Sequence, residues 1–147
     1  MVKTADRIAE LGQQGMFCSQ ILLTMGLEMR GEENPQLVRA ASALAGGLGF
    51  SGGTCGSLTG GACLIGLYAG RGTSDEDDTG MLQPMVNDLV DWFSERVGER
   101  YGGITCDEIL DGKSRNMIDR CPGIVAETYQ HVKDLLVEEG FDLGGGA

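Results

Sequence analysis

The sequence predicts an all-α fold: a compact helical bundle in a single domain, with a glycine-rich helix at its centre. Three observations support this prediction. Apolar residues recur at helical spacing along most of the chain, without the alternation that is typical of β-strands. Glycine, proline and helix-capping residues divide the chain into helix-length pieces. Hydrophobic residues make up 41% of the chain and charged residues 22%, which is the composition of a globular protein.

In chain order, the predicted helices span residues 4–11, 16–29, 35–45, 54–68, 83–100, a short segment opening at 105, and 121–139. Gly12 and Gly15 separate the first two helices, and Gly31 ends the second. Pro35 suits the first turn of the third helix, because the N–H that proline lacks has no partner there. A glycine-rich connection, residues 46–53, then leads to the central helix.

The central helix is expected to begin after a Thr54 cap and to contain four glycines. Each glycine disfavours a helix by about 0.8–1 kcal/mol relative to alanine, so tertiary packing must offset roughly 3–4 kcal/mol. Gly52, Gly56 and Gly60 recur every four residues, which lets another backbone or a cofactor approach closely. Gly56 and Gly60 are therefore the candidate cofactor-binding residues, and close helix packing is the alternative.

The later helices are predicted from their ends. Pro84 lies in the first turn of the long amphipathic helix, and Gly102 follows its end. Thr105 and Glu108 have the spacing of a capping box and open a short helix. Pro122 suits the first position of the last helix, which would make the preceding cysteine its cap. On that helix, the lone histidine is expected to lie on the solvent-exposed face.

Charge and composition limit location and partners. The chain has 11 basic and 22 acidic residues and a net charge of −11, which repels nucleic acid and anionic membranes. The uncharged stretch 40–70 contains too much glycine for a membrane span, so a buried hairpin is expected. The N-terminal residues show no signal peptide, which predicts a cytoplasmic protein. Residues 1–143 are expected to form one domain, followed by a flexible tail, 144–147.

Four of the five cysteines lie at predicted helix starts: Cys18, Cys55, Cys106 and Cys121. The partial positive charge of a helix N-terminus can lower a cysteine pKa from ~8.5 to ~3.5–7.5, which favours the thiolate that attacks disulfides or ligates metals. No C-x-x-C pattern occurs, so any ligand set must be assembled by folding. Cys63 lies in the middle of the central helix and is expected to pack in the core. Simple burial of a small apolar residue is the alternative for each of the other four.

The segment 55–60, Cys-Gly-Ser-Leu-Thr-Gly, is similar to the Cys-Gly-Ala-x-x-Gly motif of a family of small bacterial and archaeal proteins, C_GCAxxG_C_C. Ser57 stands where the motif usually has alanine. Cys18 resembles the first family cysteine, and Cys106 and Cys121 resemble the last two, so the resemblance covers most of the chain. The family is described as redox-active because it shares four cysteines. The resemblance therefore implies that the four cysteines form one set.

Two hypotheses follow from the sequence. In the first, the four cysteines of an oxidoreductase or electron carrier bind an iron–sulfur cluster or another soft metal, or exchange thiols with disulfides of a redox partner. In the second, the chain is a non-enzymatic binding or assembly module in which the glycine stripe packs against a second copy and the cysteines are merely buried. The sequence leaves both hypotheses open.

Overall fold

The predicted helices form in the computed structural model, which describes residues 3–144. The helices are α1 Thr4–Gln13, α2 Cys18–Met29, α3 Pro35–Ala41, α4 Gly56–Ala69, α5 Leu82–Phe93, α6 Glu99–Tyr101, α7 Cys106–Leu110 and α8 Asn116–Glu138. A 3-10 turn, Ser42–Leu44, extends α3, and a π-helical segment, Ser94–Gly98, joins α5 to α6. No strand occurs between residues 3 and 144, so the all-α prediction is confirmed. Residues 145–147 of the expected tail lie outside the described residues.

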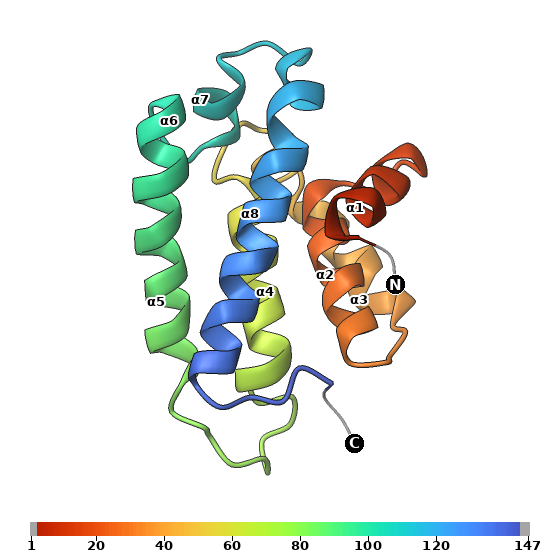
Figure 1. Cartoon of the computed structure of the whole chain (residues 1–147), viewed down its shortest axis with the longest axis vertical. Helices are drawn as coiled ribbons and strands as arrows, with labels where there is room; N and C mark the ends of the chain where they lie inside the picture. Colours follow the sequence, from red (N-terminus) through yellow and green to blue (C-terminus); the bar gives the residue numbers. More distant parts are fainter. Residues whose placement is uncertain (1–2, 145–147) are drawn as a thin grey trace.

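Helix α4 occupies the centre of the bundle, with α2, α5 and α8 packed around it (Figure 1). Helices α1 and α3 pack against α2, and α1 also contacts α8. Helix α7 and the first turns of α8 lie together at one end of the bundle, and the loop between α4 and α5 lies at the other (Figure 1). In this arrangement, the N-terminal ends of α2, α4, α7 and α8 lie at or near the same end.

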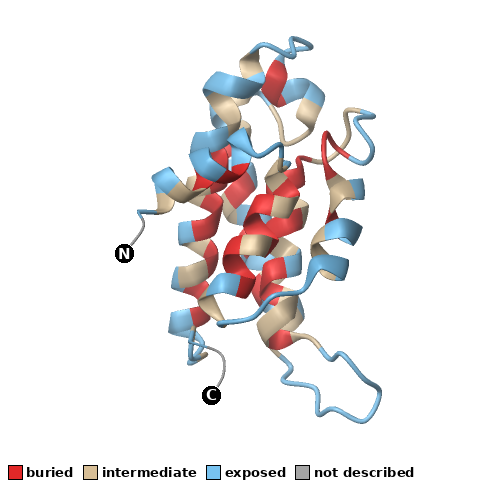
Figure 2. Ribbon diagram, turned by 90° about the vertical axis from the view of Figure 1, so that its right-hand side faces the viewer, coloured by how far each residue is buried: buried red, intermediate tan, exposed pale blue. Residues whose placement is uncertain are grey.

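The buried side chains are concentrated in the middle of the bundle (Figure 2). Leu64 and Ile65 of α4 have no exposed surface, and neither do Leu22 of α2, Leu89 of α5 and Leu136 of α8. Each such side chain contributes roughly 1.5–3 kcal/mol through the apolar surface that it removes from water. The core of the bundle therefore lies around the central helix, as the sequence predicts.

Small residues let α2 and α4 approach closely. A Cβ at Gly60 would lie 2.9 Å from the Cα atom of Ser19, and one at Gly61 would lie 2.9 Å from the Thr128 methyl group of α8. The Ser19 hydroxyl donates a hydrogen bond of 2.8 Å to the carbonyl oxygen of Ala41, which ties α2 to α3 as well. This packing within one chain offsets the helix penalty of the glycines.

Two predicted caps behave differently. Thr105 caps α7 as expected: its hydroxyl accepts a hydrogen bond of 3.1 Å from the Glu108 N–H, and the Glu108 carboxylate accepts one of 3.2 Å from the Thr105 N–H. Thr54 does not cap α4, because it pairs with Thr105 in an isolated antiparallel bridge. The bridge keeps Thr54 extended, and Cys55 takes the cap position instead.

The prediction that Cys121 caps the last helix is wrong. Helix α8 begins at Asn116, so Cys121 and Pro122 lie inside it. The early turns are held by α7: the Asn116 side chain donates to the Leu110 carbonyl at 2.7 Å, and the Arg120 guanidinium donates to the Ile109 carbonyl at 2.6 Å. These tertiary hydrogen bonds offset the bond that a proline inside a helix cannot make.

The prediction that His131 is solvent-exposed is also wrong. Its ring stacks on Trp92 of α5, with centroids 4.3 Å apart and planes within 6°. Its Nε2 atom lies 3.0 Å from a carboxylate oxygen of Asp88. Only a fifth of the side chain is exposed, because α5 covers the face of α8 that the sequence presents as polar.

The uncharged stretch 40–70 lies inside the bundle rather than in a membrane-like helix. It supplies the end of α3, the connection 46–53 and all of α4, and much of it is buried. Within residues 3–144, no helix combines the length and the apolar character that crossing a bilayer requires. Burial of this stretch, as predicted, is found along α4, whereas Leu48 and Phe50 of the connection are exposed.

Candidate functional site

A cavity of about 400 Å³ opens at the end of the bundle where α7 meets α8. Its walls come from α1, the start of α2, the segment between α3 and α4, α7, and the first turns of α8. The cysteines that line it are Cys18, Cys55, Cys106 and Cys121. The four residues that the sequence groups together are therefore gathered around one space.

The bridge between Thr54 and Thr105 positions two of these cysteines. On one side, the Cys55 N–H donates to the Ile104 carbonyl at 2.9 Å, and on the other, the Cys106 N–H donates to the Gly53 carbonyl at 2.7 Å. Successive side chains of extended backbone point to opposite faces, so the residues that follow the two threonines share a face. That face is the cavity wall.

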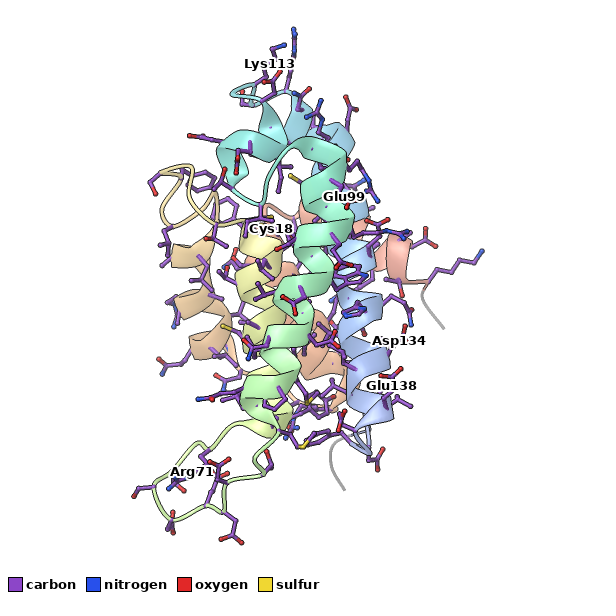
Figure 3. All side chains as sticks on the ribbon, turned by 90° about the vertical axis from the view of Figure 1, so that its left-hand side faces the viewer. Cys18, Arg71, Glu99, Lys113, Asp134 and Glu138 are labelled. Atoms are coloured by element: carbon purple, nitrogen blue, oxygen red, sulfur yellow. The ribbon has the colours of Figure 1, made fainter. Side chains whose placement is uncertain are left out.

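Cys18 and Cys121 reach the cavity from α2 and α8. Cys18 lies in the first turn of α2, as predicted, and its sulfur lies against Gly56. A Cβ at Gly56 would be 2.7 Å from the Cys18 sulfur, so only glycine leaves room for the thiol there. Cys121 faces the cavity from the second turn of α8. Figure 3 places Cys18 inside this end of the bundle, with Lys113 pointing outward from its tip.

The two candidate cofactor glycines have different surroundings. Gly56 lies on the cavity wall beside the Cys18 sulfur. Gly60 lies one turn further along α4, where the backbone of Ser19 fills the space in front of it. Any cofactor role would therefore fall to Gly56, while Gly60 serves the contact between α2 and α4.

The thiols of the cavity hold their protons more tightly than ordinary cysteines. Burial, with smaller contributions from the nearby Cys55 and Cys106 thiols, raises the pKa of Cys18 to about 11. Burial, and then repulsion from the other three thiols, raises the pKa of Cys121 to about 12. The pKa values of Cys55 and Cys106 are raised as well, first by burial. The resting site is therefore a cluster of neutral thiols, contrary to the predicted thiolates.

At Cys18 and Cys55 the helix starts lower the thiol pKa values, as expected, but burial outweighs this effect. A hydrogen bond from the Ser19 N–H lowers the pKa of Cys18, and bonds from the Ser57 and Leu58 N–H groups lower that of Cys55. The Ser57 hydroxyl also lies close enough to both sulfurs to lower both pKa values. Ser57 is almost fully buried, and it links the first two cysteines of the set.

The cavity wall carries no formal charge. Among the described residues that line it, none is Asp, Glu, Lys, Arg or His, and apart from the thiols the only polar side chain is that of Gln13. Without a nearby cation, nothing offsets the cost of burying a thiolate. The missing positive charge explains why burial sets the pKa values of these thiols.

Cys63 lies apart from this set, but the prediction that it packs in the core is wrong. It is exposed on the surface of α4, whereas its neighbours Leu64 and Ile65 are fully buried. Helix α4 is apolar on most of its circumference, so the sequence does not show which side faces outward.

The four thiols do not form a ready-made metal site. Among residues 3–144, no three Cys, His, Asp or Glu side chains are placed to hold one ion. An all-sulfur donor set suits soft metals, but the side chains would have to move together to bind one. As they lie, their arrangement fits neutral thiols better than metal ligands.

The mouth of the cavity exposes large apolar side chains, which the sequence analysis did not identify. Phe17 and Phe50 pack edge to face there, with centroids 5.2 Å apart, and Met117 and Ile118 line the same opening. Ile118 is 83% exposed and Phe50 is 56% exposed. The only hint in the sequence is the glycine-rich connection that carries Phe50.

That connection forms a left-handed turn. All five residues from Gly46 to Phe50 have φ between 60° and 75°, including Leu48 at 70°. This conformation costs a residue other than glycine roughly 1–2 kcal/mol, so two large apolar residues are held there at a cost. The turn presents the Phe50 ring over Phe17 at the cavity mouth.

A comparison with known families agrees with the grouping of the cysteines. A family model described as "Putative redox-active protein (C_GCAxxG_C_C)" matches residues 16–135, which include all four cavity cysteines. The chain belongs to this family. Neither the curated proteins nor the solved structures that were compared give a match. The C_GCAxxG_C_C match thus supports a redox function in general. A particular reaction has to be inferred from the geometry of the cavity.

Proposed function

We propose that the protein is a thiol–disulfide oxidoreductase whose cavity cysteines cycle between dithiol and disulfide. The observation that carries the proposal is the gathering of four neutral thiols in one uncharged cavity. A thiol and a disulfide are both uncharged, so this cavity accommodates either state without a counter-ion. A redox partner outside the chain would supply or remove the two electrons of each cycle.

Cys18 and Cys55 are the first pair in this proposal. The Ser57 hydroxyl lowers the pKa values of both thiols, and the ionisation of Cys55 raises the pKa of Cys18. Gly56 leaves the space in which the Cys18 sulfur can approach the start of α4. Cys106 and Cys121 lie close enough to this pair for the thiols to repel one another when ionised: Cys121 interacts most strongly with Cys18, and Cys106 with Cys55.

The reaction has two steps. The Cys18 or Cys55 thiol loses its proton and attacks one sulfur of a disulfide, which forms a mixed disulfide and releases one thiol that takes up the proton. The second cysteine then attacks the protein sulfur, closes the disulfide within the protein, and releases the other thiol with the second proton. Overall, two protein thiols are oxidised and one disulfide is reduced. The N–H groups and the Ser57 hydroxyl would stabilise the attacking thiolate.

The deciding experiment equilibrates the protein with mixtures of reduced and oxidised dithiothreitol. The remaining thiols are then blocked, and the disulfide-linked peptides are mapped by mass spectrometry. We expect a reversible Cys18–Cys55 disulfide, with Cys63 free in every sample. The C106A/C121A variant should still form it, whereas C18A and C55A should not. If Cys18 and Cys55 stay reduced in the most oxidising mixture, the proposal fails.

Binding of an iron–sulfur cluster or another soft metal is the second candidate, favoured by the all-sulfur donor set. It predicts bound metal and visible absorption after anaerobic purification, both lost when any of the four cysteines is replaced. Dithiol cycling predicts colourless protein and a change in thiol content. Metal analysis of the same samples separates the two candidates.

The assembly-module hypothesis loses its main support. The glycine stripe that would receive a second copy is covered by α2 of the same chain, by the Cys18 sulfur at Gly56 and by the Ser19 backbone at Gly60. A homodimer would have to use another surface. Measuring the mass in solution of the wild-type protein tests this.

A further inference from the structure

We infer that the cavity selects small disulfides with uncharged, apolar substituents and excludes charged ones. The inference rests on the proposed function for its chemistry, but its evidence is separate. It comes from the walls and the mouth of the cavity rather than from the thiols.

The walls are the first argument. The described lining residues carry no charge, and a charged substituent would have to enter without an ion-pair partner. Transfer from water to such a site costs free energy for a carboxylate or an ammonium group, whereas the same transfer is favourable for an apolar ring. The net charge of −11 adds repulsion against anionic substrates over the whole surface.

The mouth is the second argument. Large apolar side chains are usually buried, but Phe17, Phe50 and Ile118 are exposed around this one opening. Leu48 and Phe50 also keep a left-handed backbone conformation that costs free energy. An apolar ligand entering the cavity would cover these side chains, which gives their exposure a function.

The size of the cavity is the third argument. About 400 Å³ lies within the ordinary range of sites for small organic molecules and exceeds what a bond between two cysteines needs. Gly12 borders this space, and a Cβ there would meet no atom within 4 Å. A substrate with one ring or a short apolar chain therefore has room beside the thiols.

The chemistry is that of the two-step exchange. The apolar disulfide enters, one cavity thiol attacks its nearer sulfur, and the first apolar thiol leaves with the proton. The second cavity thiol displaces the other half as a thiol and closes the protein disulfide. One substrate disulfide thus yields two apolar thiols, and no further oxidant or reductant takes part.

The test compares two aromatic disulfides that differ in charge. Neutral 4,4′-dithiodipyridine and dianionic 5,5′-dithiobis(2-nitrobenzoate) are reacted with the C63A variant, which keeps the cavity thiols. They are also reacted with the C18A/C55A/C106A/C121A variant, which keeps only exposed Cys63. Both variants carry the same net charge. We expect the ratio of neutral to dianionic rates to be at least about tenfold higher for the cavity thiols. Equal ratios would overturn the inference.

A charge at the mouth sharpens the test. Ile118 is exposed, so I118K and I118E in the C63A background should fold normally. I118K should raise the rate of the dianionic disulfide by about two- to fivefold relative to I118E. V137K and V137E, on an exposed residue of α8 about 28 Å further along the helix, provide the matched control and should not differ. If the Ile118 variants match the Val137 variants, this opening is not the route to the thiols.

A binding measurement on a variant without cavity thiols separates this inference from the proposed function. The uncharged fluorescent probe N-phenyl-1-naphthylamine should bind the quadruple alanine variant at one site. Adding G12L to that variant should fill the space and abolish binding, while G66L, at another glycine with open space, should not. If the probe binds but no reversible disulfide forms, only the proposed function is contradicted. If reversible disulfides form but there is neither probe binding nor charge selectivity, only this inference is contradicted. If the protein forms a concentration-dependent dimer that the I118K substitution dissociates, the apolar mouth binds a second copy of the chain. That result would also overturn this inference.

Discussion

The middle of the bundle and its cysteine end are built by the same helices but packed in opposite ways. In the middle, Gly60 and Gly61 bring α4 against α2 and α8, and the surrounding apolar side chains are fully buried. At the cysteine end, the helices leave about 400 Å³ between them, with neutral thiols inside and apolar rings exposed at the opening. Close packing in one region thus supports an open, reactive cavity in the other, and substitutions should affect the two regions separately.

The largest expected effect is the loss of close packing in the middle. In G60A, the added Cβ would lie 2.9 Å from the Ser19 backbone, so α2 must move away from α4. We expect the free energy of unfolding to fall by roughly 1–3 kcal/mol, measured by urea denaturation. G66A is the matched control: its Cβ meets nothing, so helix propensity should raise the stability by up to about 1 kcal/mol. Equal effects would show that the packing contact is unimportant.

The second effect belongs to the cysteine end and depends on pH. The folded-state pKa of Cys18 is about 11, above the unfolded value of ~8.5, so Cys18 stabilises the fold fully below pH 8.5. As the pH rises, the unfolded chain loses this proton first. The free energy of unfolding should therefore fall by roughly 1–2 kcal/mol for Cys18 between pH 8 and pH 10.

Cys121, with a pKa of about 12, acts in the same direction. The control for this effect is the C18A/C121A variant, measured by urea denaturation at each pH under reducing conditions. Its stability should change less over the same range. A wild-type curve as flat as that of the variant would show that these thiols are not held neutral by the fold.

The third effect is smaller and concerns reactivity. In S57A, which restores the usual alanine of the family motif, Cys18 and Cys55 lose the hydroxyl that lowers their pKa values. One hydrogen bond is worth about 0.5–1.5 kcal/mol, so alkylation of both cysteines by iodoacetamide should slow by roughly two- to tenfold. S19A is the control, because its hydroxyl donates to Ala41 and not to a sulfur. A larger slowing in S19A than in S57A would contradict the role of Ser57.

The smallest expected effect concerns Cys63, which belongs to neither region. Its side chain is exposed, so C63A should change the stability by less than about 0.5 kcal/mol and leave the Cys18–Cys55 disulfide intact. Mass spectrometry after oxidation checks the second point. Loss of the cavity disulfide in C63A would mean that Cys63 takes part in the exchange.

Local features of the sequence predicted the fold well. The pattern Thr105–Glu108 implied a capping box that the structure contains, and Pro35 begins α3 as expected. The four-cysteine set came from helix placement and from the family motif, and the structure gathers its members around one cavity. The helix starts depend on residues close together in the chain, and the cysteine set depends on a family motif, which is why the sequence reveals both.

The remaining features depend on contacts between distant segments. Cys121 lies inside α8 because Arg120 and Asn116 bond to the end of α7, and no local pattern records those bonds. The pKa of Cys18 is raised because several segments bury its sulfur, although its helix start alone would lower it. Trp92 covers His131 for the same reason. In each case, tertiary packing outweighs a correct local rule.

Pro122 lies where α8 passes from the cavity wall into the packed core. Because proline has no N–H, the rung that would end on the carbonyl of Ile118 is missing just where Cys121 meets the cavity. Beyond Pro122, the side chains of Val132 and Leu136 are fully buried and anchor the rest of α8 in the core. We therefore expect any movement of Cys121 during the proposed exchange to be confined to the turns before Pro122, because the turns after it are anchored in the core.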